Sequence, residues 1–291
     1  MKSPVLLYSI IICIVCSLLE AQTYASDFID KDVTIPSKDI KLQGSLMVPS
    51  HAKRGMVVLI ISGAGATDRN GNSRFTQSNC LYQLARSLAK KDITSLRYDK
   101  RGIGRSTYNL ANESDLHFSD FIDDALSCIK YLQKRKKYKY IYVIGYSQGA
   151  LVGAAACNRS DVSGYVSISG ASKTGDQIIK KQLEALTQKQ LQQEALNILE
   201  KLKKGEQNVE VPITLRSLFR PSIQPFLISW FNYNPIKEVE KITSPILILN
   251  GDKDLQNSIN DAKHLQQANK LAEIKIIKGM NHVLKEVGDD I

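Results

Sequence analysis

The sequence contains few cysteines and histidines, the residues that build disulfide frameworks and most zinc sites. Of its 291 residues, five are cysteines and four are histidines. Cys13 and Cys16 lie in an apolar N-terminal segment, which leaves Cys80, Cys128 and Cys157 in the rest of the chain. An odd number excludes a fully paired disulfide framework, although a single bridge remains open. These three lie in apolar helical patterns without metal-ligand spacing, so we expect packing residues and no metal site.

The apolar N-terminal segment is shorter than the about 20 residues that a stable membrane span needs. It runs from Val5 to Leu19, follows the basic Lys2, and precedes small residues around a cleavage position after Ala25. This order of charge, apolar stretch and small residues predicts a signal peptide over residues 1–25. The mature protein is then exported, to the periplasm or the medium, without a stable membrane span. The alternative is an uncleaved N-terminal anchor.

Acidic residues are fewer than basic residues, and an excess of positive charge can indicate a polyanionic partner. Lys and Arg total 39 against 29 Asp and Glu, a net charge of +10. The densest basic cluster, Lys134 to Tyr140, contains two tyrosines and lies between a predicted helix and a predicted strand. Basic residues at a helix C-terminus interact favourably with its dipole, so we interpret the cluster as a solvated helix end. We therefore predict no nucleic-acid partner.

Strand and helix patterns alternate along most of the chain. Buried parallel strands have continuous apolar sequences, as at 56–61, and further strands are predicted at 93–98, 141–144, 165–168, 246–249 and 274–277. Helical spacing of apolar residues follows at 81–88, 121–132, 150–156 and 258–270. This alternation predicts an α/β fold with a mostly parallel central sheet flanked by helices. Residues 33–35 and 42–48 alternate apolar and polar side chains, which favours an antiparallel lead-in at one edge of the sheet.

The alternation stops between residues 171 and about 235. Residues 176–204 have the apolar spacing of an amphipathic helical region, and residues 219–233 concentrate aromatic side chains among prolines. An insertion of this kind, late in a parallel sheet, predicts a helical cap over residues 172–235. The core then has two parts, residues 26–171 and 236–291.

The sharpest local motif is Gly145-Tyr146-Ser147-Gln148-Gly149, a G-x-S-x-G sequence. It follows a predicted strand and begins a helix of small residues, which is the context that this motif requires. A tight turn there lifts the hydroxyl of Ser147 above the sheet. Ser147 is therefore the candidate nucleophile.

A serine hydroxyl needs a base, and the chain offers few histidines. Only His282 lies in a loop after the last predicted strand, where the order serine, acid, histidine places the base. For the acid, Asp252 and Asp254 both follow the strand that ends at Gly251. Asp254 is favoured because it lies farther beyond the strand and has room to turn towards His282, and the alternative role for Asp252 is to cap the turn. The predicted triad is Ser147, Asp254 and His282.

Acyl transfer also requires hydrogen-bond donors for the negative charge that develops on the carbonyl oxygen. The backbone N–H of Gln148, directly after the nucleophile, is one candidate. The second is the N–H of Ala64, in the small-residue loop that follows the strand ending at Ile61. The chemistry needs neither a metal nor an organic cofactor.

Several motifs in the same order resemble the α/β-hydrolase superfamily, especially bacterial esterases and serine-aminopeptidase-like relatives. They are Gly63 to Asn72, Arg97 to Gly102 with Gly104-Arg105-Ser106, Leu218 to Ser222, and Gly279-Met280-Asn281-His282. Within the first of these, Ala64, Ala66 and Asn70 depart from the usual residues, but backbone donation survives such changes. The charged side chains of these motifs, such as Asp99 and Arg101, are interpreted as ion pairs that fix loops rather than as substrate ligands.

The resemblance implies hydrolysis of small-molecule carboxylic esters with short acyl chains, and it leaves the oligomeric state open. An aminopeptidase or thioesterase with the same triad, or a non-catalytic binding protein, are the alternatives. In the cap, Phe226 and Trp230 are the candidate lining of the acyl pocket, unless they only anchor the cap. The chain ends nine residues after His282 (291 − 282 = 9), where relatives continue into a terminal helix. Without that helix, an apolar face of the sheet is expected to be exposed.

Overall fold

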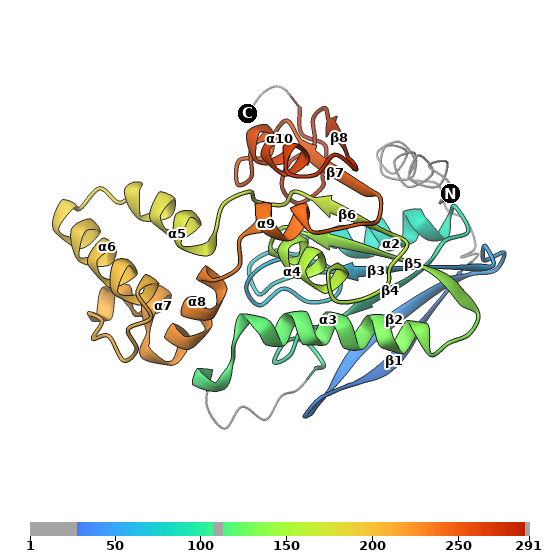
Figure 1. Cartoon of the computed structure of the whole chain (residues 1–291), viewed down its shortest axis with the longest axis horizontal. Helices are drawn as coiled ribbons and strands as arrows, with labels where there is room; N and C mark the ends of the chain where they lie inside the picture. The colour runs from blue at the N-terminus through green and yellow to red at the C-terminus, as the bar shows by residue number, and fades with distance from the viewer. Residues whose placement is uncertain (1–27, 107–112, 289–291) are drawn as a thin grey trace.

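An eight-stranded sheet forms the centre of the protein in the computed structural model, which describes residues 28–106 and 113–288 (Figure 1). The predicted signal peptide, residues 1–25, lies outside the described residues. The strands run in the order β1-β2-β4-β3-β5-β6-β7-β8. Their bounds are β1 (Phe28–Ser37), β2 (Ile40–Pro49), β3 (Gly55–Ile61), β4 (Thr94–Tyr98), β5 (Tyr138–Tyr146), β6 (Gly164–Ile168), β7 (Ile246–Gly251) and β8 (Ala272–Ile277).

The pairing of these strands follows the predicted division into an antiparallel edge and a parallel centre. β1 pairs with β2 and β2 with β4 in antiparallel fashion, whereas all neighbours from β4 to β8 are parallel. Successive side chains of a strand point to opposite faces, and in β3 Val57 and Val58 belong to different hydrophobic clusters. Both are fully buried, which is why both faces of β3 carry apolar side chains.

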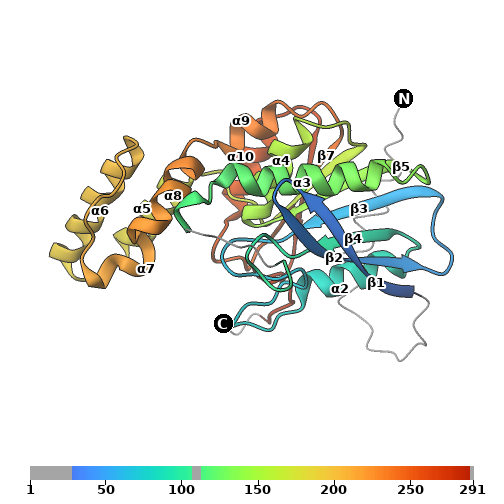
Figure 2. The same cartoon turned by 90° about the horizontal axis from the view of Figure 1, so that it is seen from below.

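Helices cover both faces of this sheet. The core helices are α2 (Cys80–Ala89), α3 (Phe118–Gln133), α4 (Gln148–Cys157), α9 (Pro235–Glu240) and α10 (Ile259–Gln267), with the short η1 (Glu113–Asp115) before α3. Figure 2 shows α3, α4, α9 and α10 on one side and α2 on the other. The hydrophobic clusters agree, because the buried residues of α3, α4 and α10 share one cluster and those of α2 belong to the other. The predicted fold class is therefore confirmed.

The inserted segment between β6 and β7 forms a separate helical unit at one end of the molecule (Figures 1 and 2). Its elements are α5 (Gly175–Glu184), α6 (Lys189–Lys203), η2 (Ile213–Leu215), α7 (Arg216–Phe219), η3 (Pro221–Ile223) and α8 (Gln224–Phe231). They enclose their own hydrophobic cluster, with Leu199, Leu202 and Phe219 almost fully buried. The predicted helical region 176–204 is two helices, because the chain turns between Glu184 and Lys189. We call α5 to α8 the cap.

The cap is attached to the core through α8, which packs against α3. The backbone N–H of Phe118 donates to the hydroxyl of Ser229 at 2.8 Å, and Arg220 forms an ion pair with Glu113 at the start of the same region. α9 begins at Pro235 and packs on α4 and α10, so it belongs to the core.

After β8, the described residues up to 288 form turns and no helix. Val166 in β6 and Leu247 in β7 have no exposed surface, and Met280 is 3% exposed, whereas Ile274 in the edge strand β8 is 36% exposed. The expected exposure of apolar side chains is thus absent at Val166 and Leu247 and present at Ile274. Among the residues that the structure describes, none of the helices has the length and apolar character needed to cross a membrane.

Candidate active site

The candidate nucleophile lies at a sharp turn between β5 and α4. Ser147 has a φ of 54°, a backbone conformation that non-glycine residues rarely adopt, and its N–H donates to the carbonyl of Ile168 at 2.9 Å. A Cβ on Gly145 would lie 2.3 Å from the carbonyl oxygen of Gly149, and a Cβ on Gly149 would lie 2.5 Å from that of Ile61. Both glycines of the motif are therefore required for the strand and the helix to approach this closely.

His282 reaches Ser147 from the turns that follow β8. Its Nε2 lies 3.2 Å from the Oγ of Ser147, and its side chain is 11% exposed. The hydroxyl of Tyr146 donates to the carbonyl oxygen of His282 at 2.9 Å, and the two rings lie 5.4 Å apart. Tyr146 therefore fixes the segment that carries the histidine. This role of Tyr146 was not predicted from the sequence, because the residue occupies a variable position of the G-x-S-x-G motif.

Asp254 lies on the other side of the imidazole. Its two carboxylate oxygens are 3.0 and 2.9 Å from Nδ1 of His282, and its side chain is fully buried. Burial by itself raises the pKa of Asp254, but hydrogen bonds from His282 and the N–H of Asn257 lower this pKa below its usual value. The carboxylate is therefore ionised at neutral pH. Asp252 is exposed and accepts instead from the N–H of Gly279 at 2.7 Å.

The loop after β3 lies directly against the nucleophile. A Cβ on Gly63 would lie 3.1 Å from the Cβ of Ser147, a tight contact, so a larger residue would push the loop away from the nucleophile. Ala64 and Gln148, the two candidate oxyanion donors, line the same cavity as Ser147. Across the described ranges, neither backbone N–H donates to a backbone carbonyl. Both groups are therefore available to a ligand.

Lys100 holds that loop in place through hydrogen bonds to its backbone, a role that the sequence did not reveal. Its side chain is 4% exposed, and Nζ donates to the carbonyl oxygens of Gly63 and, at 2.8 Å, Gly65. In a trans peptide the C=O and the next N–H point in opposite directions, so a Gly63 carbonyl held towards Lys100 turns the Ala64 N–H away from it. Burial lowers the pKa of Lys100 from 10.5 to about 7. The neutral amine still has two N–H groups for the two carbonyls.

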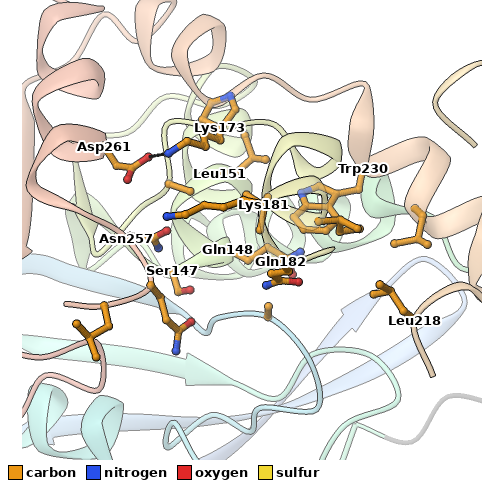
Figure 3. Close-up of a pocket in the computed structure, with 18 residues that line it drawn as sticks. Ser147, Gln148, Leu151, Lys173, Lys181, Gln182, Leu218, Trp230, Asn257 and Asp261 are labelled. Atoms are coloured by element: carbon orange, nitrogen blue, oxygen red, sulfur yellow. Dashed lines mark hydrogen bonds and ion pairs between the residues drawn. The ribbon is translucent and has the colours of Figure 1, made fainter. Parts of the chain in front are cut away.

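A cavity of about 520 Å³ opens beside Ser147, between the core and the cap (Figure 3). Most of its wall is apolar, with Leu151 from α4 and Ile179, Leu218 and Leu227 from the cap. Trp230 also lines it, as Figure 3 shows. This volume is typical of sites for small molecules.

The other predicted pocket residue, Phe226, is not part of this lining. Its ring packs against Phe118 at 6.1 Å and Phe121 at 5.5 Å, both on α3, and against Trp230 at 6.4 Å. Phe226 thus anchors the cap to the core, which is the alternative role considered for these aromatics. Trp230 contributes to both the anchor and the cavity.

The charged motifs near the site form ion pairs outside the cavity lining, of which Arg69–Asp99 and Arg101–Asp124 are buried and Arg105–Asp32 is exposed. Arg69 binds Asp99 at 2.9 Å, and Arg101 binds Asp124 at 2.6 Å with both side chains almost fully buried. Arg105 pairs with Asp32 at 2.9 Å. These contacts fix the loops after β3 and β4. In residues 28–106 and 113–288, His, Cys, Asp and Glu side chains do not gather in groups of three that could hold a metal ion.

Comparisons with known proteins show what the chain is similar to. A family model described as serine aminopeptidase, S33, matches residues 74–216, a range that includes Ser147 and ends before Asp254 and His282. Esterase EstD of Thermotoga maritima is 27% identical over 267 residues, which cover 88% of this chain and 60% of that protein. The chain thus spans less than two thirds of the length of that relative.

Two solved esterase structures share the fold. Est1E from Butyrivibrio proteoclasticus superposes with a TM-score of 0.59 at 18% identity, covering 87% of this chain and 90% of that one. An esterase of Pyrococcus furiosus gives 0.58 at 19% identity, with 91% and 88% covered. With the sheet order, the turn at Ser147 and these likenesses taken together, the chain has the α/β-hydrolase fold and is similar to proteins of that superfamily.

Proposed function

We propose that this protein is a serine esterase that cleaves small carboxylic esters through an acyl-enzyme intermediate. The observation that carries the proposal is the continuous hydrogen-bonded chain from Ser147 through His282 to the buried Asp254, at the wall of an apolar cavity. The similarity to EstD and to esterase structures supports the choice of esters as the substrate class.

In this mechanism, His282 Nε2 accepts the proton of Ser147 as Oγ attacks the carbonyl carbon of the ester. The oxygen that becomes negative accepts hydrogen bonds from the N–H groups of Ala64 and Gln148. Protonated His282, stabilised by ionised Asp254, then gives the proton to the departing alcohol, leaving an acyl group on Ser147. Water repeats the sequence with His282 as base, releases the acid and restores the serine hydroxyl.

Acyl chains of short to medium length fit this proposal. The cavity of about 520 Å³ must hold the acyl group or the alcohol close to Ser147, and its apolar wall contributes about 25 cal/mol for each Å² of ligand surface that it buries. Longer chains must extend past the cap into solvent and gain less from burial.

An aminopeptidase is the second candidate, because the matching family model carries that description. Such an enzyme must bind the ammonium group of its substrate near the nucleophile, which favours an unpaired carboxylate in the cavity. Asp261 is the acidic residue that lines this cavity, and it already pairs with Lys173 at 3.3 Å. This pairing favours the esterase. A thioesterase uses the same machinery as an esterase and differs in the leaving group.

The test is hydrolysis of 4-nitrophenyl acetate, longer 4-nitrophenyl esters and amino-acid anilides by the purified protein, with Ser147→Ala as the matched control. We expect ester hydrolysis that is lost in the variant, and labelling of Ser147 alone by a fluorophosphonate. If Ser147→Ala still hydrolyses esters and is still labelled by the fluorophosphonate, the nucleophile is another residue. A folded wild-type protein that neither reacts with the probe nor turns over any of these substrates would favour a non-catalytic binding protein.

Export of the protein belongs to the same proposal. It rests on the sequence of residues 1–25, with cleavage near Ala25. Mass determination of the N-terminus after expression in a bacterium with an intact secretion pathway tests it. An N-terminus at Ser26 is the expected result, and retention of Met1 or Lys2 would contradict it.

A further inference from the structure

The cavity beside Ser147 has an uneven distribution of charge. Three ionisable side chains line it, namely Lys173, Lys181 and Asp261. Figure 3 shows Lys173 joined to Asp261, whereas the side chain of Lys181 extends across the cavity towards the side on which Asn257 is drawn. The lining therefore contains two cations and one anion.

Asp261 has no capacity left for a second cation. Its carboxylate accepts hydrogen bonds from the hydroxyls of Ser172 and Ser258, each at 2.7 Å, and from the N–H of Ser258 at 2.9 Å, besides the ion pair with Lys173. Burial raises the pKa of Asp261, but these hydrogen bonds hold it well below its usual value. Asp261 is thus an anion whose partners are already fixed at the N-terminus of α10.

Lys181 remains without such a partner. Across the described parts of the chain, its ammonium group forms no hydrogen bond and no ion pair, in contrast to Lys173 and to Lys203 on the neighbouring α6. The other polar groups of the wall near it are neutral amides, such as Gln182 and Asn257. Lys181 is exposed to solvent, and the placement of α5 over Ser147 brings its side chain to the wall of the substrate cavity.

We propose that the preferred substrates are esters that carry a carboxylate, bound by Lys181 while their apolar part lies against the wall of the cavity. This inference rests on the proposed esterase activity and names its substrate class. The ammonium group binds the carboxylate as a point charge, while the ester carbonyl lies at Ser147. Leu151 and Trp230 contact the hydrocarbon between the two groups.

Two matched pairs of esters test this substrate class. The first pair is mono-4-nitrophenyl adipate and 4-nitrophenyl hexanoate, whose acyl chains have the same number of carbons and differ in the terminal carboxylate. The second pair is 4-acetoxybenzoate and its methyl ester, which place the charge on the leaving group. For each pair, the ratio of kcat/KM for the charged and the neutral ester is measured after subtraction of spontaneous hydrolysis. The ratio cancels general effects on folding and on the catalytic residues.

We expect Lys181→Gln to lower this ratio about two- to fivefold in at least one pair, because an ion pair open to water contributes modestly. Lys181→Glu lowers it further, since it replaces attraction by repulsion. Lys180→Gln is the matched control, because Lys180 is an exposed residue of the same helix that does not line the cavity. It leaves both ratios within about twofold of the wild type. Raising the salt concentration reduces the wild-type preference and leaves Lys181→Gln unchanged.

Ratios that stay within twofold in both Lys181 variants, for both pairs, would overturn the inference. If the neutral esters are still hydrolysed in a manner that depends on Ser147, the esterase proposal stands while the substrate class is rejected. If no ester of either pair is hydrolysed and Ser147 fails to react with a fluorophosphonate, the esterase proposal itself is rejected, and the substrate class with it.

Discussion

Replacement of Lys100 by Met gives the strongest test of how the site is built, because one side chain affects both stability and catalysis. The folded-state pKa of Lys100 is about 7, against 10.5 for an exposed lysine. The folded protein therefore binds fewer protons than the unfolded chain between these two values. Stability from this group rises with pH in that window, because protonation penalises only the folded state.

The size of this effect follows from the two pKa values. Between pH 7 and pH 9 the linkage relation gives the wild type a gain of about 2 kcal/mol relative to a protein with an uncharged residue at position 100. The methionine side chain fills a similar volume and does not titrate. The unfolding free energy of the wild type minus that of Lys100→Met is therefore expected to rise by about 2 kcal/mol from pH 7 to pH 9. Taking the difference cancels the contributions of the other titrating groups.

Catalysis responds through the Gly63–Ala64 peptide. Lys100→Met leaves the carbonyls of Gly63 and Gly65 without the donor that orients them, so the Ala64 N–H loses its fixed direction towards Ser147. Complete loss of one oxyanion donor costs about 10²–10³ in kcat. Because this donor is loosened rather than removed, we expect kcat to fall about 10- to 100-fold with little change in KM.

The measurements are urea unfolding at pH 7, 8 and 9, and ester hydrolysis at one pH where both proteins are folded. Lys130→Met, which removes an exposed lysine of α3, is the control and is expected to change neither quantity. An unfolding difference that is constant from pH 7 to 9 would refute the assigned protonation behaviour. An unchanged kcat in a folded Lys100→Met protein would refute the positioning role.

Two further predictions concern the acid and the cap. Asp254→Asn is expected to lower kcat by about 10⁴, because the amide no longer holds His282 in the required tautomer, whereas Asp252→Asn changes it little; equal kcat losses would contradict this assignment. Trp230→Ala is expected to shift the acyl-chain preference of kcat/KM, and Phe226→Ala to lower the unfolding free energy by about 2 kcal/mol with the preference unchanged. An acyl-chain preference that changes in Phe226→Ala and not in Trp230→Ala would contradict the observed cavity wall.

The parallel centre of the fold was predictable because its strands are buried on both faces. Such strands tolerate few polar residues, and the uninterrupted apolar run of 246–249 became the start of β7. The role of Ser147 was equally predictable, because the glycines that its turn requires are its neighbours in the sequence. The break between α5 and α6 was not predicted, because Ala185 to Gln188 contain no glycine or proline. The carbonyls at the end of α5 instead accept hydrogen bonds from the side-chain amide of Gln192 in α6.

Side-chain direction marked the limit of prediction in the cap. Phe226 and Trp230 are four positions apart on α8 and contact each other, so their spacing alone gives them the same role. The position of α3 distinguishes them, because Phe118 contacts both rings, Phe121 contacts Phe226, and Trp230 also reaches the cavity. A pattern within one helix cannot contain this distinction, since it depends on a second helix about one hundred residues earlier in the chain.

For the same reason, the roles of Lys100 and Lys181 could not be predicted from the sequence. Lys100 lies in a motif of charged residues in which Asp99 and Arg101 do form ion pairs, and its own partners are backbone carbonyls from another loop. Lys181 has the spacing of a solvated residue, and the position of the cap alone brings it to the wall of the cavity. The triad depends on residue types that the chemistry dictates, whereas the charge presented to the substrate depends on where the inserted helices lie. Variation of the cap can therefore change the preferred ester while Ser147, Asp254 and His282 stay the same.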